Sequence, residues 1–123
     1  MARRTSPALT DAEARVMGVL WQRKAATVGD VVAAFKKHPV TYSTVQTILR
    51  ILETKGYVAH DKVERAFVYR PIVDQAQARR RALRHLVGRL FEGSPSLLVA
   101  NVLDDESIDA SELQRLKELI QHA

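Results

Sequence analysis

The sequence predicts a mainly α-helical protein in which a single two-stranded β-hairpin interrupts a series of helices. In most segments apolar residues recur at helical spacing, usually just after a residue that can cap a helix. Between residues 57 and 71 the spacing changes to alternation, which is typical of half-buried strands. A length of 123 residues, with 46% hydrophobic and 27% charged residues, suits a small domain with an appendage and excludes a disordered or collagen-like chain.

Two capping boxes mark the first two helices. Thr10 and Glu13 begin a helix expected over residues 11–23, whose apolar residues are Val16, Met17, Val19, Leu20 and Trp21. Thr27 and Asp30 repeat the pattern more weakly. They precede an expected second helix of about eleven residues.

The third helix is expected over residues 42–55, with Thr41 as its cap and Gly56 closing it. Its apolar residues at helical spacing are Val45, Ile48, Leu49 and Leu52. The opposite face carries hydroxyls, an amide and a guanidinium with no acid, from Ser43, Thr44, Gln46, Thr47 and Arg50. Such a face can bind the phosphates and base edges of a DNA duplex, and a solvated polar face is the plainer alternative.

The hairpin is expected from two β-type segments, residues 57–61 and 67–71, around a polar turn. Three helices followed by a hairpin is the order of a winged helix-turn-helix, in which the hairpin packs beside the recognition helix. Lys62 and Arg65 at the tip are then candidate phosphate or minor-groove contacts, although charged hairpin turns are also common. We expect this DNA-binding domain to span residues 1–73.

Residues 74–123 are expected to form a helical dimerisation domain. A long helix follows Asp74, a short apolar segment covers residues 96–103, and a final helix follows Asp109. A segment of this size buries little surface by itself. It must therefore fold back on the first domain or pair with a second copy. We favour a two-fold symmetric homodimer. The candidate interface residues are Leu83, Leu86, Val87, Leu90, Phe91, Leu97, Leu98, Leu113, Leu116 and Ile120.

Charge is divided unevenly along the chain. Residues 1–91 hold 17 Lys and Arg against 7 Asp and Glu, whereas residues 92–123 hold 2 against 7. The net charges are therefore +10 and −5. A basic front part favours a polyanion such as DNA, because neutralising phosphates releases condensed counterions.

Several function classes find no support in the residues. The chain has no cysteine, which excludes disulfides and thiolate metal sites and favours a cytoplasmic location. Its apolar runs fall far short of the roughly 20 residues that a membrane span needs. Four histidines lie in different segments without metal-ligand spacing, and there is no phosphate-binding loop. We expect no enzyme, cofactor, metal site or membrane insertion; a winged-helix module that binds another protein is the remaining alternative.

Short segments in a fixed order carry a family resemblance. They are Leu9-Thr10-Asp11-Ala12-Glu13, Val16-Met17, Leu20-Trp21, Tyr42-Ser43-Thr44-Val45-Gln46-Thr47, Leu52-Glu53-Thr54-Lys55-Gly56-Tyr57-Val58, Val68-Tyr69-Arg70-Pro71 and Gly93-Ser94-Pro95-Ser96-Leu97-Leu98-Val99. Together they resemble the penicillinase repressor and methicillin-resistance repressor family (BlaI/MecI type), over nearly the whole chain.

The resemblance implies a winged helix, a helical dimerisation region, and a homodimer that represses antibiotic-resistance or related genes from a pseudo-palindromic operator. It also implies that the helix after Thr41 is the recognition helix. Family members are typically released when a membrane sensor protease, triggered by β-lactam, leads to cleavage after an Asn that precedes Phe. The matching dipeptide here is Asn101-Val102, with Val in place of Phe.

Overall fold

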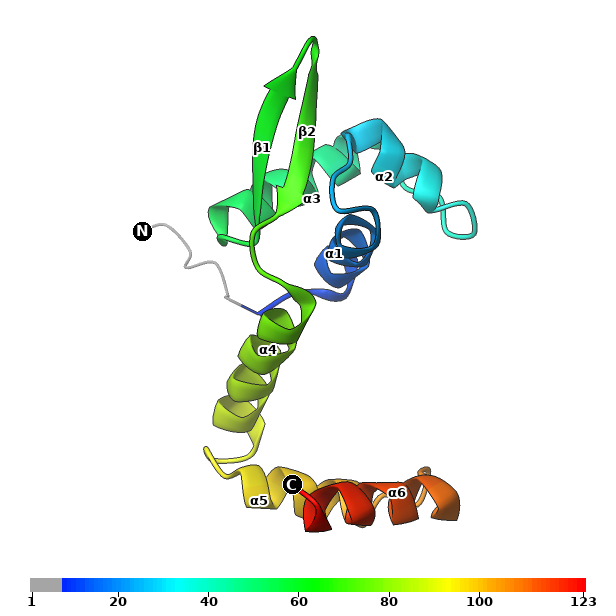
Figure 1. The fold of residues 1–123 in the computed structure, drawn as a ribbon, viewed down its shortest axis with the longest axis vertical. Helices are drawn as coiled ribbons and strands as arrows, with labels where there is room; N and C mark the ends of the chain where they lie inside the picture. Colours follow the sequence, from blue (N-terminus) through cyan, green and yellow to red (C-terminus); the bar gives the residue numbers. More distant parts are fainter. Residues whose placement is uncertain (1–7) are drawn as a thin grey trace. The chain divides into compact units, whose positions relative to one another are not determined.

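The computed structural model describes residues 8–123 and confirms a mainly α-helical fold with one antiparallel hairpin (Figure 1). In chain order the elements are α1 (Asp11–Arg23), α2 (Val28–Ala34), α3 (Tyr42–Thr54), β1 (Val58–Val63), β2 (Ala66–Pro71), α4 (Gln75–Leu90), α5 (Pro95–Leu103) and α6 (Ala110–Gln121). The chain divides into two compact units, one ending at Ala82 and the other covering Leu83–Ala123, so the division falls within α4.

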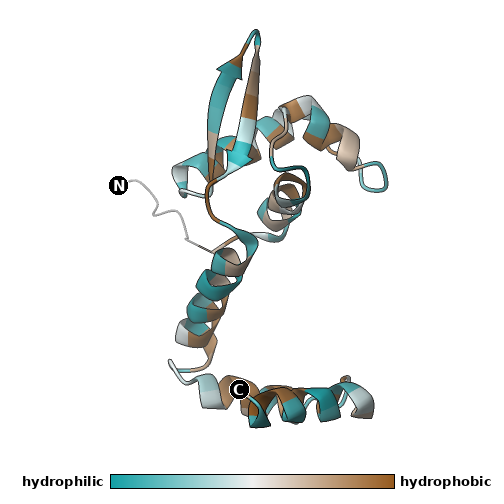
Figure 2. Cartoon of the chain, viewed as in Figure 1, coloured by the Kyte–Doolittle hydropathy of each residue, from teal (hydrophilic) through white to brown (hydrophobic). Residues whose placement is uncertain are grey.

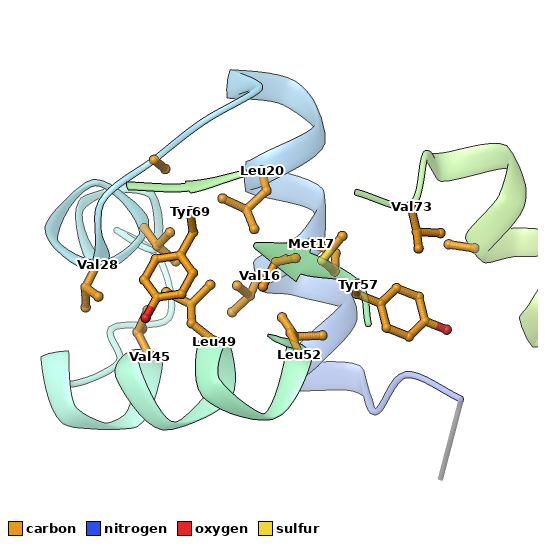
Figure 3. Close-up of a cluster of buried hydrophobic side chains, with 14 residues drawn as sticks. Val16, Met17, Leu20, Val28, Val45, Leu49, Leu52, Tyr57, Tyr69 and Val73 are labelled. Atoms are coloured by element: carbon orange, nitrogen blue, oxygen red, sulfur yellow. The ribbon is translucent and has the colours of Figure 1, made fainter. Parts of the chain in front are cut away.

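The first unit has a hydrophobic core of its own, built by α1, α2, α3, the hairpin and the start of α4. Figure 3 shows Val45, Leu49 and Leu52 of α3 pointing toward the side chains of α1. The largest fully buried side chains are Val16, Met17, Leu20, Val31, Val45, Leu49, Leu52, Tyr57 and Val58. Burying one such aliphatic side chain stabilises a fold by about 1.5–3 kcal/mol. This unit therefore has the means to fold without a partner.

The first turns of α4 belong to this core. Val73 and Ala78 are almost fully buried, and the Trp21 indole Nε1 donates a 2.9 Å hydrogen bond to the Val73 carbonyl. The Arg81 guanidinium lies 5.3 Å from the centre of the Tyr57 ring, a cation–π contact. These contacts fix the beginning of α4 to α1 and to the residue before β1.

Side-chain caps begin the helices at the predicted positions. The Glu13 amide donates to Thr10 Oγ1 at 3.2 Å, and the Thr10 amide donates to Glu13 Oε1 at 2.9 Å. Thr27 and Asp30 form the same reciprocal box at 3.1 and 3.0 Å, and Thr41 caps α3. Each such cap satisfies amides that would otherwise lack partners and contributes about 1 kcal/mol.

Two local predictions were wrong. The second helix has 7 residues rather than about eleven, because Phe35 leaves helical geometry (φ −95°, ψ 55°) and packs its ring against the core. The strands continue closer to the tip than predicted: β1 reaches Val63 and β2 begins at Ala66. Lys62 therefore lies within β1 opposite Phe67, and only residues 64–65 form the turn.

The second unit lacks such a core. Asp109 caps α6 as predicted, and Ser94, which was not predicted as a cap, caps α5; yet neither helix contains a buried residue. Figure 2 shows hydrophobic residues along both helices. Large apolar side chains of this unit are 38% to 67% exposed, namely Leu83, Leu86, Leu90, Leu97, Val99, Leu119 and Ile120. Contiguous exposed apolar surface of this kind is typical of an interaction site.

Candidate nucleic-acid interface

The outward face of α3 presents the predicted polar residues. Ser43, Thr44, Thr47 and Arg50 are exposed, and Gln46 is half-buried. The opposite face, with Val45, Leu49 and Leu52, is fully buried. Because the core fixes that inner face, the polar face has one orientation relative to the rest of the first unit.

The hydroxyls at the start of α3 form a local cluster. Thr41 Oγ1 accepts a 3.2 Å hydrogen bond from the Thr44 amide and donates a 2.8 Å bond to Thr44 Oγ1. The Ser43 hydroxyl lies 3.3 Å from Thr41 Oγ1. Thr47 Oγ1 donates to the Ser43 carbonyl at 3.0 Å, so the methyl group of Thr47 is what remains for a base contact.

Arg50 is unpaired at this surface. Within residues 8–123 its guanidinium makes no ion pair and no hydrogen bond, so its five donors are available to a ligand. Three residues further along α3, Glu53 is paired: its Oε2 lies 2.6 Å from His60 Nδ1 on β1. Neither Glu53 nor His60 was predicted as a site residue, because only the fold places α3 beside β1.

A groove of about 300 Å³ lies where the starts of α2 and α3 meet β2 and the hairpin turn. It is lined by Thr27, Val28, Tyr42, Gln46, Arg65, Ala66, Phe67 and Tyr69. The structure therefore brings Gln46 and Arg65 together, while Lys62 is exposed outside the groove. Burial raises the pKa of the Tyr69 hydroxyl, and the nearby Glu53 carboxylate raises it further. Tyr69 is thus a neutral hydroxyl in the wall of the groove at physiological pH.

The hairpin is fixed at its base. Tyr69 exchanges two backbone hydrogen bonds with Ala26, at 2.8 and 2.9 Å, which ties β2 to the loop between α1 and α2. On the outer face of the hairpin, Arg70 Nε donates to Asp61 Oδ2 at 3.1 Å. Both of these charged side chains are at least half exposed, so their pair contributes less than about 1 kcal/mol.

A buried ion pair holds the end of α3. Lys55 Nζ lies 2.7 Å from Glu13 Oε1, and both side chains are less than 7% exposed. Lys55 also donates to the Ala8 carbonyl at 3.0 Å, while Glu13 still caps α1. Removing one partner of such a pair leaves an uncompensated buried charge and costs about 3–5 kcal/mol. Glu13 was predicted as a capping residue, but its burial and its pairing with Lys55 were not, because charged residues at these positions are usually exposed to solvent.

The predicted interface residues of the second unit are mostly accessible. Leu83, Leu86, Leu90, Leu97 and Ile120 are exposed, Phe91, Leu98, Leu113 and Leu116 are half-buried, and Val87 is buried. An apolar groove of about 310 Å³ between α5 and α6 also involves residues that the sequence analysis omitted, namely Val99, Val102, Leu103 and Leu119. For Val99, Val102 and Leu103 the signal was present in residues 97–103, which are apolar except for Asn101, and for Leu119 it was the apolar spacing of the final helix.

The Asn101-Val102 dipeptide lies within α5. Asn101 is exposed and its side-chain amide donates to the Leu97 carbonyl at 2.9 Å, whereas Val102 lines the apolar groove. Its peptide bond is helical, so a protease that binds extended peptides reaches it only when this part of α5 unfolds.

Comparison with known families identifies the chain. The family model described as "Penicillinase repressor" matches residues 9–122. The chain belongs to the penicillinase repressor family. The match confirms the resemblance, and because the family consists of DNA-binding transcriptional repressors, it also confirms that the chain is not an enzyme.

Relatives match this penicillinase repressor family member from end to end. The penicillinase repressor of Bacillus licheniformis is 29% identical over 117 residues, which cover 94% of this chain and 91% of the relative. The methicillin resistance regulatory protein MecI of Staphylococcus aureus (strain N315) is 20% identical over 113 residues, or 91% and 92% of the two chains.

Two solved structures match the first part of the chain at 33% identity, covering 61% of this chain and 93% of each solved chain. One is the DNA binding domain of the repressor BlaI, with a TM-score of 0.53. The other is the monomeric form of Bacillus licheniformis BlaI in complex with the blaP half-operator, with a TM-score of 0.50. They confirm the winged-helix fold of the N-terminal part.

The residues described hold no other recognised site. Within residues 8–123, no three histidine or acidic side chains gather where they could hold a metal ion. No helix in the same range combines the length and the apolar character needed to cross a bilayer.

Proposed function

We propose that this chain is a sequence-specific repressor that binds a pseudo-palindromic DNA operator as a homodimer. The observation that carries the proposal is the outward face of α3, where an unpaired Arg50 and the amide of Gln46 lie on a helix fixed by its buried face. The monomeric form of the B. licheniformis relative binds a half-operator, which supports one DNA-binding domain per half-site.

Each polar group of α3 has a distinct role in this proposal. Arg50 and Gln46 hydrogen-bond to base edges in the major groove, and the Thr47 methyl contacts thymine. Thr41, Ser43 and Thr44 bind phosphates beside the free amides of the helix start. From the hairpin, Lys62 and Arg65 bind the backbone or enter the minor groove.

The second half of the proposal is the homodimer. We place the DNA-binding domain at residues 1–73 and the dimerisation domain at residues 74–123. Exposed leucines on α4, α5 and α6, together with the apolar groove between α5 and α6, support pairing with a second copy. Two-fold symmetry then presents two recognition helices about one or two helical turns apart on one face of the DNA.

Relief of repression follows from the same region. We propose that a sensor-dependent cut at Asn101-Val102 separates α6 from the rest of the chain. Because α6 supplies Leu116, Leu119 and Ile120 to the apolar groove, loss of α6 weakens the dimer. A weaker dimer binds the two half-sites of the operator together less tightly. The repressor acts in the cytoplasm, where its operator is.

Salt dependence separates this function from a winged helix that binds protein. For duplex binding, the logarithm of the association constant falls linearly with the logarithm of salt concentration, with a slope of about −0.9 per phosphate contact. Fluorescence anisotropy with duplexes enriched from a random-sequence pool provides the measurement. A protein-binding module would enrich no sequence and show no such slope.

A further inference from the structure

Glu53 is the one acid in the sequence of α3, and Arg50 is its one basic residue. The two lie three residues apart, a spacing at which opposite charges on a helix attract each other. A free Glu53 carboxylate would therefore compete with DNA for the Arg50 guanidinium and would repel nearby phosphates. In the structure this does not happen, because Glu53 Oε2 lies 2.6 Å from His60 Nδ1.

His60 is held in place for this contact. It lies opposite Tyr69 in the β1–β2 register, and its ring centre is 4.9 Å from that of Phe67 and 5.3 Å from that of Tyr69. Tyr69 is itself bound to Ala26, so the aromatic support is part of the fixed base of the hairpin. The imidazole and the carboxylate remain 35% and 38% exposed, which keeps both in exchange with solvent.

We propose that His60 is a positioning residue of the DNA-binding surface, which holds the Glu53 carboxylate away from Arg50 and from the phosphates. This inference rests on the proposed function, because it concerns how α3 meets DNA. DNA is a polyanion, so a carboxylate on the surface that meets it repels the phosphates unless that carboxylate is engaged elsewhere.

The other charged groups near this pair do not take the place of His60. On the hairpin, Lys62 shares the face of β1 that carries His60, and the Asp61–Arg70 pair lies on the opposite face. Within residues 8–123, the side-chain partner of the Glu53 carboxylate is His60.

The test measures dissociation constants at one pH and one salt concentration for wild type, H60A, H60Q, E53Q and the double variant E53Q/H60A. The probe is a duplex enriched by the wild-type protein from a random-sequence pool. His122→Gln, at the end of α6, is the matched histidine control and should bind like wild type. Thermal unfolding of each variant confirms that it is folded.

We expect E53Q to bind about threefold to tenfold more tightly than wild type, because it removes one like charge from the phosphate-facing surface. H60A should bind more weakly than wild type, and E53Q should rescue it fully. H60Q, which keeps a hydrogen-bond donor for the Glu53 carboxylate, should bind like wild type.

Three results would overturn the inference: E53Q no tighter than wild type, H60A still weak when combined with E53Q, or H60Q as weak as H60A. The second would mean that His60 acts on the hairpin itself. If the wild-type protein binds no duplex, the proposed function fails as well, which distinguishes the two failures.

Discussion

The two units of this chain differ in how their apolar residues are used. In the first, α1, α3 and the hairpin enclose side chains such as Leu20 and Leu49 completely. In the second, α5 and α6 bury no residue, although α5 consists largely of Leu, Val and Ala. Both units have properly capped helices, so local propensity is not what separates them. From this difference we infer that the first unit folds as a domain by itself, and we propose that the second unit becomes stable through a partner surface.

The largest expected effect is loss of the dimer on removing α6. A chain that ends at Asn101 lacks one wall of the apolar groove, so it should be monomeric at micromolar concentration while the full chain is dimeric. Sedimentation-velocity ultracentrifugation measures both species. The first unit, with its own core, should give an unchanged unfolding transition in the truncated chain. A truncated chain that is still dimeric would contradict the role assigned to α6.

A matched pair of leucine substitutions sharpens the contrast between the units. L49A removes a fully buried side chain and should destabilise the first unit by about 2–5 kcal/mol at every protein concentration. L119A removes a side chain that is 59% exposed in the single chain, so its effect should appear only in dimer dissociation. Urea unfolding at several concentrations measures both. If L119A lowered stability independently of concentration, the partner-dependent account of the second unit would be wrong.

Within the first unit, two cations should affect DNA binding differently. If Arg50 reads a base edge, as we propose, R50A should cost about 1–3 kcal/mol with the preferred duplex and relax the preference at one base pair. If Lys62 contacts a phosphate, as we propose, K62A should weaken binding to all duplexes alike and reduce the salt slope by about 1. Anisotropy titrations with preferred and scrambled duplexes measure both effects. Unchanged affinity and selectivity in R50A would remove Arg50 from the recognition set.

The smallest expected effect is acid loosening of α6. Hydrogen bonds from the Glu112 amide and the Ser111 hydroxyl hold the pKa of Asp109 below its ordinary value of 3.8. A lowered pKa means that the cap stabilises the helix above that value and that the contribution is lost as the pH falls below it. D109N should show little of this acid-dependent loss, measured as helix content by circular dichroism. An identical acid profile for D109N and wild type would contradict the capping role.

Much of the fold could be predicted because its signals are local. Capping patterns of three or four residues mark the helix starts at Thr10, Thr27 and Asp109. The hairpin is predicted by the change near Tyr57 from helical spacing to alternation of apolar and polar residues. The length of α2 was predicted wrongly because Phe35 leaves helical geometry and packs against the core instead of continuing the helix.

The candidate site could be predicted only in part, because some of it depends on contacts between elements. The polar face of α3, which includes Arg50, could be predicted from the helical spacing of polar and apolar residues in the sequence. The pairs Glu53–His60 and Glu13–Lys55 join residues that are 7 and 42 positions apart, and only the packing of α3 against β1 and α1 brings them together. Charged residues that look like solvated surface in a sequence can therefore become buried or paired once helices pack.

Selection of DNA duplexes from a random-sequence pool by the full chain, followed by sequencing, tests the central claim most directly. A dimer that reads DNA with two copies of α3 should enrich an inverted repeat whose half-sites are centred about 10 or 20 base pairs apart. Enrichment of a single unrepeated site, or of no sequence at all, would contradict it.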